Sequence, residues 1–560
     1  MLITSWALVA QAELKKYRRQ WFAKRKGLVT LIREQLSGQE SRLIDTEAEV
    51  KAQDADAALM ELGADVVAYG YYTATVTVWD PDLEACRLKM ERVCAAINNA
   101  GFATKVETTN SFQAWLSSLP GHVYANVRRP LLNTLNLAHL FPLSAIWSGA
   151  PCDEHLAAKF GVAAPLMVCD TTGATPFRLN LNVGDVGHTA IFGPTGAGKT
   201  SLLCMLALQW RRYPRAQVII LDVKRGARAP TLAMGGSYYE PGNPDRPVAF
   251  QPLADVDTEA GLAWADTWVE MLLELQGVSV TPHARAELHQ SLVALAGSPQ
   301  HERTVTGYQQ LLQHEGLREA LAPYTLGGAF GQIFDSDHDT FRLDDWLHVE
   351  MEPLMELGEA AVLPALSYLF RRLEARFGGR PTLLVLDECW FALSHPFFAS
   401  RLKKYLKMLR SKSVYVVFAT QEIEDAVDSS IAATILASCQ TKIFLPNAGA
   451  MDPAGREAYA RCGLTDTEIQ LLQTATPKRH YFYRSPAGKR LFDMELGPVA
   501  LAFAGRSSDQ DQRLLDELEA TCPPGEIATA LLRDRGLEWA IDLLAQAYPV
   551  LTEQPLAATA

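Results

Sequence analysis

One nine-residue stretch limits the fold of this chain more than any other feature: residues 193–201 read GPTGAGKTS. The spacing is Gly-x4-Gly-Lys-Thr, in which the glycines let successive backbone N–H groups surround a phosphate without a Cβ clash. The apolar run HTAIFG leads into the stretch, and the helix-forming run SLLCMLALQWRR leads out of it. This order of strand, loop and helix predicts a phosphate-binding loop within an α/β domain.

The loop predicts where ATP and Mg²⁺ bind. Lys199 is expected to reach the β- and γ-phosphates, and the Thr200 hydroxyl is expected to coordinate Mg²⁺. The start of the following helix adds partial positive charge to the same place. The nucleotide-binding prediction therefore covers the whole loop: Gly193, Pro194, Thr195, Gly196, Ala197, Gly198, Lys199, Thr200 and Ser201.

Polar residues at the ends of two later apolar runs predict the rest of the catalytic site. Asp387 ends LLVLDE together with Glu388, and we expect Asp387 to hold Mg²⁺ and Glu388 to act as general base toward water. The other interpretation is an acidic pair that caps the next helix. Gln421 ends VVFATQ and is expected to contact the γ-phosphate or the attacking water, supported by Thr420; the alternative is a solvent-facing strand end.

A phosphate-transferring site also needs positive charge opposite the transition state. The basic segment RLKKYLKMLRSK (401–412) offers Arg410, our first choice for an arginine finger supplied by a neighbouring subunit. Arg371 and Arg372 in FRRLEARFGGR are the alternatives. An ordinary basic helix face explains each of these arginines equally well.

Short apolar strands that alternate with helical stretches predict a mostly parallel sheet covered on both faces. We expect an α/β motor domain at 151–505, with a mainly helical insertion at about 255–345. A smaller α+β domain at 1–150 is expected to hold strands at 71–79 and 102–109 and a helix between them. Helices and a tail are expected at 506–560.

Composition narrows the class of protein. A net charge of −12 argues against broad coating of DNA, although a local basic patch stays open. The nine cysteines form no Cys-x-x-Cys pair, which favours reduced thiols in a cytosolic protein. No apolar run is long enough to span a bilayer. KKYRRQWFAKRK (15–26) is interpreted as a solvated or packed helix face, or as a contact for phosphates or anionic lipid headgroups.

The sequence segments that contain and flank these motifs resemble a known family. LPGHVYANVRRPLLNTLNLAHLFPLSAIWSG, GDVGHTAIFGPTGAGKTSLL, YLFRRLEARFGGRPTLLVLDECW and VVFATQEIEDAVDSSIAATILASCQTKIFLPN together resemble the conjugal transfer ATPases of type IV secretion systems, of the TrbE type. The ending PKRHYFYRSPAGKRLFDMELGPVALAF with RDRGLEWAIDLL is also similar. The resemblance covers most of the chain from about residue 10, and these flanks are far more specific than a P-loop alone.

The resemblance implies a RecA-like motor of the kind found in hexameric translocases, cytoplasmic and peripheral at the bacterial inner membrane. Such a motor would join inner-membrane components of the secretion system and energise pilus assembly and substrate transfer. Lys199 and Thr200 fall on the family's Walker A motif, Asp387 and Glu388 on its Walker B motif, and Gln421 on its sensor. Arg410 falls in the basic segment where the family places a candidate arginine finger.

Three features depart from the family pattern. The P-loop begins at 193, much earlier than is usual, so we expect the front of the N-terminal domain to be absent, which puts membrane association and docking in doubt. DVKRGAR (222–228) differs from the expected Asp-Lys-Gly-Arg type of segment, and Cys389 stands where alanine is commoner. We predict an ATP-hydrolysing secretion motor; a DNA-translocating coupling-type pump in contact with DNA, and a nucleotide-binding scaffold, stay open as alternatives.

Overall fold

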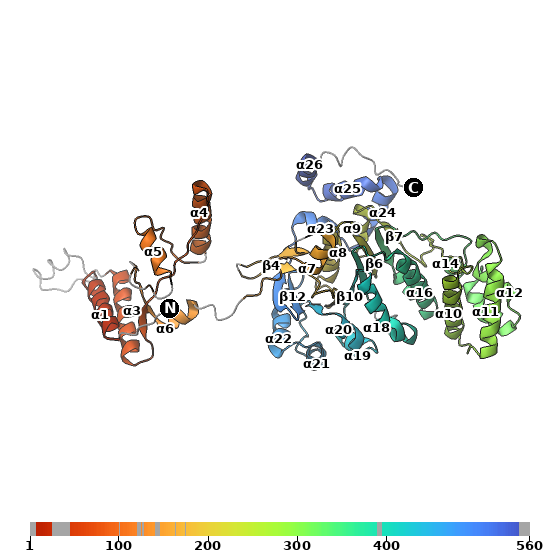
Figure 1. Ribbon diagram of the computed structural model, residues 1–560, viewed down its shortest axis with the longest axis horizontal. Helices are drawn as coiled ribbons and strands as arrows, with labels where there is room; N and C mark the ends of the chain where they lie inside the picture. Colours follow the sequence, from red (N-terminus) through yellow and green to blue (C-terminus); the bar gives the residue numbers. More distant parts are fainter. Residues whose placement is uncertain are drawn as a thin grey trace, which may run out of the picture. The chain divides into compact units, whose positions relative to one another are not determined.

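The computed structural model describes residues 7–24, 45–99, 101–119, 122, 125, 128–140, 146–162, 164–173, 175–388 and 395–547. The chain divides into two compact units, Met1–Ala145 and Ile146–Ala560 (Figure 1). Each unit has its own apolar core. No helix in the described ranges has the length and apolar content needed to cross a membrane.

The first unit is a small α+β unit. Its antiparallel strands are β1 (Tyr69–Tyr71) and β2 (Leu131–Asn133). Its helices are α1 (Ala7–Lys24), α3 (Thr46–Gly63), α4 (Leu83–Asn99), α5 (Ser111–Ser117) and α6 (Thr134–Leu140). The long helices α1 and α3 pack together around a small core that includes Leu14, Leu62 and Tyr69.

The expected strands of this unit are mostly wrong, whereas the expected helix at 82–99 is confirmed as α4. Of residues 71–79 only Tyr71 is in a strand, and 102–107 follow no regular hydrogen-bonding pattern. Alternation of apolar and polar residues makes a stable strand only when a neighbouring strand pairs with it. Among the described residues, Tyr71 pairs with Leu131, and no strand pairs with residues 72–79 or 102–107.

The second unit is built on a nine-stranded sheet in the order β13-β12-β11-β5-β10-β9-β6-β8-β7. The strands from β11 to β7 run parallel, and β12 and β13 add an antiparallel hairpin at one edge. The strands are β5 (Thr189–Phe192), β6 (Gln217–Asp222), β7 (Ser237–Tyr239), β8 (Trp346–Glu350), β9 (Thr382–Asp387), β10 (Val414–Thr420), β11 (Thr441–Phe444), β12 (His480–Ser485) and β13 (Gly488–Asp493), with a separate pair β3 (Met167–Cys169) and β4 (Phe177–Leu179).

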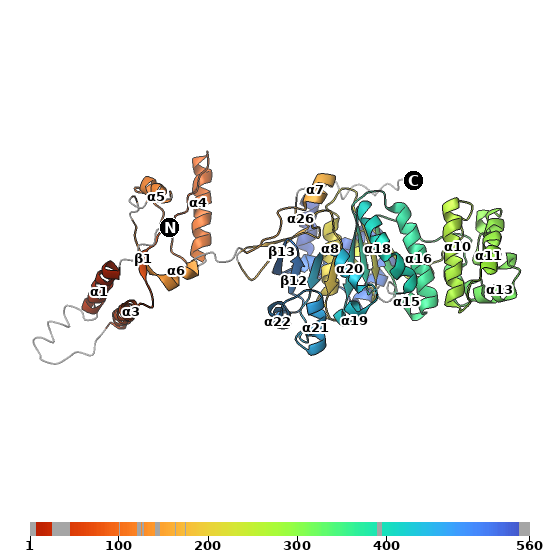
Figure 2. The same cartoon turned by 60° about the horizontal axis from the view of Figure 1, so that its bottom comes forward.

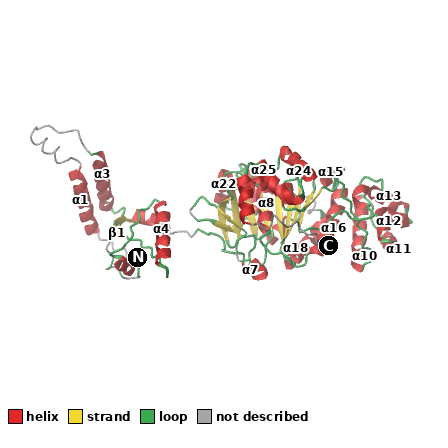
Figure 3. Ribbon diagram, turned by 90° about the horizontal axis from the view of Figure 1, so that it is seen from above, coloured by secondary structure: helices red, strands yellow, loops and turns green. Residues whose placement is uncertain are grey.

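Helices cover both faces of this sheet (Figure 3). Within β6, Val218 and Ile220 join one apolar core with helix α8, whereas Ile219 and Leu221 join the other core with α10 and α16. The helices are α7 (Glu154–Phe160), α8 (Lys199–Trp210), α9 (Arg228–Ala233), α10 (Glu259–Leu275), α11 (Pro282–Ala296), α12 (Val305–Leu311), α13 (Glu315–Leu321), α14 (Gly331–Phe334), α15 (Glu352–Glu356), α16 (Glu359–Arg376), α18 (Pro396–Ser411), α19 (Ile423–Asp428), α20 (Ala432–Ser438), α21 (Pro453–Arg461), α22 (Asp466–Thr474), α23 (Pro498–Ala504), α24 (Asp509–Thr521), α25 (Ile527–Asp534) and α26 (Glu538–Ala547).

Helices α10 to α14 follow β7 in the chain and precede β8. Figure 2 shows α10 to α13 beyond α16 on the side away from the sheet. Trp268 of α10 lies in the same apolar core as Leu366 of α16, and its indole Nε1–H donates to the Pro364 carbonyl at 3.2 Å. The boundaries given above for an insertion, a motor domain and a C-terminal segment remain predictions.

The topology places the predicted motifs at one edge. Strand β5, which enters the P-loop, and strand β9, which ends in Asp387, both pair in parallel with β10 between them. The carboxyl ends of these strands therefore meet at the same edge of the sheet. This arrangement is a RecA-like P-loop fold, and the predicted fold class is confirmed.

Candidate nucleotide site

The P-loop connects β5 to the first turn of α8. Gly196 and Gly198 have φ angles of 80° and 107°, a region in which an L-residue is strained. A Cβ on Gly198 would also lie 2.6 Å from the Tyr481 hydroxyl oxygen. Helix α8 begins at Lys199 with no side-chain cap from Gly198, so its first N–H groups are left for a ligand.

Lys199 contacts the end of β9, although the two are far apart in sequence. Its ammonium donates to Asp387 Oδ1 at 2.7 Å and also contacts Glu388. The side chains are buried: Lys199 is 6% exposed and Asp387 is 4% exposed. The Walker A lysine and the Walker B acids therefore form one cluster, which is the arrangement that their sequence motifs predict.

The predicted sensor residues join the same edge. The Thr195 hydroxyl of the P-loop donates a hydrogen bond to the side-chain carbonyl of Gln421, the residue that follows β10, so the P-loop and the end of β10 are in direct contact. The Thr420 hydroxyl donates to Glu388 Oε2 at 3.4 Å. Gln421 and Thr420 are thus brought to the P-loop and to the predicted general base respectively.

Glu388 is held in an unusual backbone conformation. Its φ angle is 54°, in the left-handed region that non-glycine residues rarely occupy. Its N–H donates to the Ala419 carbonyl at 3.0 Å, which ties this residue to β10. Such strain costs about 1–3 kcal/mol and is concentrated at functional sites, where it aims a side chain that a relaxed backbone would turn elsewhere.

Asp222 is a further acid that sequence reasoning missed. It ends β6 as Asp387 ends the neighbouring strand β9, so the two carboxyl groups lie side by side at the carboxyl edge of the sheet. Burial, and then the charges of Asp387 and Glu350, raise the pKa of Asp222 well above its usual range. Burial also raises the pKa of Asp387, against the opposing effect of Lys199. An acid at the end of an apolar strand was the available signal, since AQVIILD has the same form as TLLVLD.

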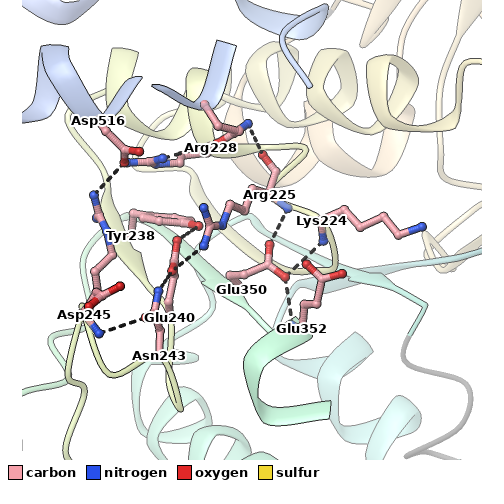
Figure 4. Close-up of polar contacts among 12 residues, drawn as sticks. Lys224, Arg225, Arg228, Tyr238, Glu240, Asn243, Asp245, Glu350, Glu352 and Asp516 are labelled. Atoms are coloured by element: carbon pink, nitrogen blue, oxygen red, sulfur yellow. Dashed lines mark hydrogen bonds and ion pairs between the residues drawn. The ribbon is translucent and has the colours of Figure 1, made fainter. Parts of the chain in front are cut away.

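The loop after β6 packs against the P-loop helix. A Cβ on Gly226 would lie 2.5 Å from Thr200 Cγ2, so the backbone at Gly226 rests directly on the Thr200 side chain. Figure 4 shows this loop, with Lys224 and Arg225 above the carboxylate of Glu350. The DVKRGAR segment, noted above only as a departure from a family pattern, is therefore part of the site's wall.

Asp222, His348 and Glu350 have side-chain ligand atoms within 4.8 Å of one another, and these residue types suit a divalent metal. The carboxylate oxygens, however, already accept five backbone N–H groups, from Val223 and Ala227 on Asp222, and from Lys224, Arg225 and Glu352 on Glu350. The group therefore anchors the loop, and Thr200 and Asp387 remain the predicted metal ligands.

Arg410 does not join the cluster within this chain. It lies in the last turn of α18 and pairs with Asp185, with Nε 3.0 Å from Asp185 Oδ2. Asp185 precedes β5, so Arg410 lies at the amino edge of the sheet, opposite the P-loop. The two alternative arginines also have contacts away from the P-loop: Arg371 stacks on Trp264, and Arg372 pairs with Asp339. A role for Arg410 in a second copy's site stays a prediction.

The basic segment at 15–26 lies partly in α1, and its last two residues fall outside the described ranges. Arg18 pairs with Asp56 of α3 at 2.9 Å. The ammonium groups of Lys24 and Lys51 lie over the ring of Trp21. These contacts favour the interpretation that α1 packs against α3, while Lys15 and Lys16 remain exposed.

Comparison with known proteins gives three findings. Residues 25–128 match the model of the CagE, TrbE, VirB family, described as a component of type IV transporter system. A probable conjugal transfer protein TrbE of Sinorhizobium fredii is 42% identical over 509 residues, 90% of this chain and 75% of that protein. The conjugal transfer protein TrbE of Rhizobium radiobacter is 41% identical over 520 residues, 91% of this chain and 62% of that protein.

Among solved structures, VirB4 of Thermoanaerobacter pseudethanolicus is similar to 60% of this chain and 98% of that chain, with 18% identity and a TM-score of 0.48. The present chain spans three quarters of the length of the Sinorhizobium fredii TrbE relative and less than two thirds of the length of the Rhizobium radiobacter relative.

Proposed function

This chain belongs to the CagE, TrbE, VirB family, and on that basis we propose that it is an ATP-hydrolysing motor of a type IV secretion system. The proposal rests on one observation: the ammonium of the P-loop residue Lys199 contacts the carboxylates of Asp387 and Glu388. The work done with the energy would be pilus assembly and substrate transfer in conjugation, in keeping with relatives that are named conjugal transfer proteins.

The charge of the cluster suits ATP with Mg²⁺. The ammonium of Lys199 pairs with both Asp387 and Glu388, and Asp222 lies next to Asp387, so the site favours additional positive charge. Thr200 and Asp387 would hold the metal, which would supply positive charge to offset that of the phosphates. Lys199, released from the two acids, would then reach the phosphates that the P-loop N–H groups surround.

Glu388 would accept the proton of the water that attacks the γ-phosphate. Its strained backbone and its hydrogen bond from Thr420 hold the carboxylate at the carboxyl edge of β9. Gln421 would contact the γ-phosphate or this water, and its hydrogen bond with Thr195 passes a change at the phosphate to strand β10.

We further propose a homo-oligomer, a hexamer by family resemblance, in which Arg410 of one copy faces the site of the next. Within the described part of one chain, Arg371, Arg372 and Arg410 all have contacts away from the P-loop, so the transition-state charge would come from a second copy. The motor would be cytoplasmic, peripheral at the inner membrane, and bound to inner-membrane components of the secretion system.

Steady-state ATPase assays of wild type, Lys199→Ala and Glu388→Gln across protein concentration test the proposal. We expect turnover per subunit to rise with concentration in wild type and to fall by at least about a hundredfold in both variants. Hydrolysis by Lys199→Ala at the wild-type rate would refute it. Stimulation by DNA with a steep salt dependence would favour the DNA-translocating pump, and ATP binding without turnover would favour the scaffold.

A further inference from the structure

Strands β6 and β8 end side by side, and their last residues, Asp222 and Glu350, are paired in register. The five-residue loop 223–227 wraps around the two carboxylates. Val223 and Ala227 donate their N–H groups to Asp222 at 2.8 and 2.9 Å, and Lys224 donates to Glu350 at 3.1 Å. Arg225 also donates its N–H to Glu350, so four of the five loop N–H groups end on these two acids.

This loop has a strained backbone. Lys224 and Arg225 have φ angles of 74° and 57°, and neither is glycine. Each left-handed residue costs about 1–2 kcal/mol, so two in succession persist only where the surroundings hold them. The Glu350 carboxylate accepts both N–H groups of this pair (Figure 4), and the side chain is 0% exposed.

The loop touches both residues to which we assign the metal. Its Gly226 rests on the Thr200 side chain, and Asp222, where the loop begins, lies beside Asp387 at the ends of the paired strands β6 and β9. The side chain of loop residue Arg225 is held as well, because its guanidinium pairs with Glu240 at 3.1 Å. A change in the loop's shape would therefore displace Thr200 and Asp387 together.

We propose that Glu350 is a positioning residue for Mg²⁺·nucleotide: it holds loop 223–227 in its left-handed shape, and the loop in turn sets Thr200 and Asp387 for the metal. This inference rests on the proposed function, since it presumes that the P-loop binds Mg²⁺·ATP. Glu350 does not itself touch the phosphates in this scheme. Residues that orient metal ligands in this way change metal affinity by about 10- to 100-fold when substituted.

The test compares Glu350→Gln with Glu352→Gln in the full chain. A glutamine amide nitrogen cannot accept an N–H, so Glu350→Gln removes one acceptor of the left-handed pair. Glu352→Gln removes the same charge two residues away and leaves these acceptors intact. Gly226→Ala is a second, independent variant: its φ angle is not positive, and its new Cβ would press on Thr200.

The measurement is the Kd for a non-hydrolysable ATP analogue, first with Mg²⁺ and then in EDTA. We expect Glu350→Gln and Gly226→Ala to raise the Kd with Mg²⁺ about tenfold while the Kd in EDTA stays within about twofold. Glu352→Gln should leave both values within about twofold of wild type.

Two results would overturn the inference: an unchanged Kd with Mg²⁺ in both variants, or equal rises with and without Mg²⁺, which a purely structural role would produce. If Glu350→Gln fails to fold, Gly226→Ala alone decides between these results. Wild type that does not bind Mg²⁺·nucleotide at all would instead refute the proposed function, so the two failures are distinguishable.

Discussion

Removing the P-loop lysine should destabilise the nucleotide-free protein, besides abolishing hydrolysis. Lys199 is the cation bonded to Asp387 and Glu388, and Asp387 is 4% exposed. Breaking a buried ion pair by removing one partner costs about 3–5 kcal/mol, because the remaining charge is left in a poorly solvating environment. We therefore expect Lys199→Ala to lower the free energy of unfolding of the second unit by about 3 kcal/mol at about pH 7.5.

A double-mutant cycle separates this pair from the loss of lysine packing. In Lys199→Met with Asp387→Asn, both charges are gone while the volumes are kept, so the double variant should be more stable than Lys199→Met alone. The expected coupling energy is about 2 kcal/mol. The cost of Lys199→Ala should shrink as pH falls, because burial raises the pKa of Asp222 and Asp387 and protonated carboxyl groups need no cation.

Urea unfolding followed by tryptophan fluorescence gives these free energies, with the two units resolved as separate transitions where they do not coincide. A Lys199→Ala protein within about 0.5 kcal/mol of wild type would contradict the expected cost, as would additive single variants in the cycle. Either result would mean that Asp387 is already neutral when no nucleotide is bound.

Three further predictions concern stability, each measured by urea unfolding. Glu388→Gly should be more stable than Glu388→Ala by about 0.5–1 kcal/mol, because glycine relieves the left-handed backbone and both variants lack the carboxylate; equal stability would argue against strain there. Burial lowers the pKa of His188 to about 4, and the ring accepts from the Val416 N–H and bonds the Leu406 carbonyl. The contribution of neutral His188 to the free energy of unfolding is present above about pH 6.5 and falls by about 2 kcal/mol between about pH 7 and 5. His188→Gln should lose this pH dependence. Trp268→Ala should cost about 3–5 kcal/mol because Trp268 is 1% exposed, whereas Trp539→Ala, 56% exposed, should cost under about 0.5 kcal/mol.

The P-loop and the two strand-end motifs could be predicted because their signals are local. Glycines mark the positive φ angles at 196 and 198, and apolar runs mark strands that are buried on both faces. Asp387, Glu388 and Gln421 lie at the carboxyl ends of such runs, and parallel strands bring those ends to one edge. Sequence was therefore sufficient to bring Lys199, Asp387, Glu388 and Gln421 to one edge of the sheet, although it missed Asp222 and did not predict the contacts.

Arg410 shows that proximity in sequence to the site motifs does not place a residue at the site of its own chain. It lies between Glu388 and Gln421 in the chain, and that placement made it the first choice for the missing charge. The segment, however, is a crossover helix between two parallel strands. Such a helix starts at the carboxyl edge and ends at the amino edge, so a residue in its last turn lies opposite the P-loop.

Local signals are enough to specify the RecA-like α/β class and the P-loop, because the hydrophobic periodicity, the glycines and the acids at strand ends each depend on only a few neighbouring residues. Long-range packing, in contrast, makes Glu350 support the loop that rests on Thr200, although Glu350 lies far beyond that loop in the chain. Long-range packing also leaves residues 72–79 outside a strand. Both outcomes have one cause: a buried carboxylate or a strand edge is stabilised by distant partners, and only the folded chain supplies them.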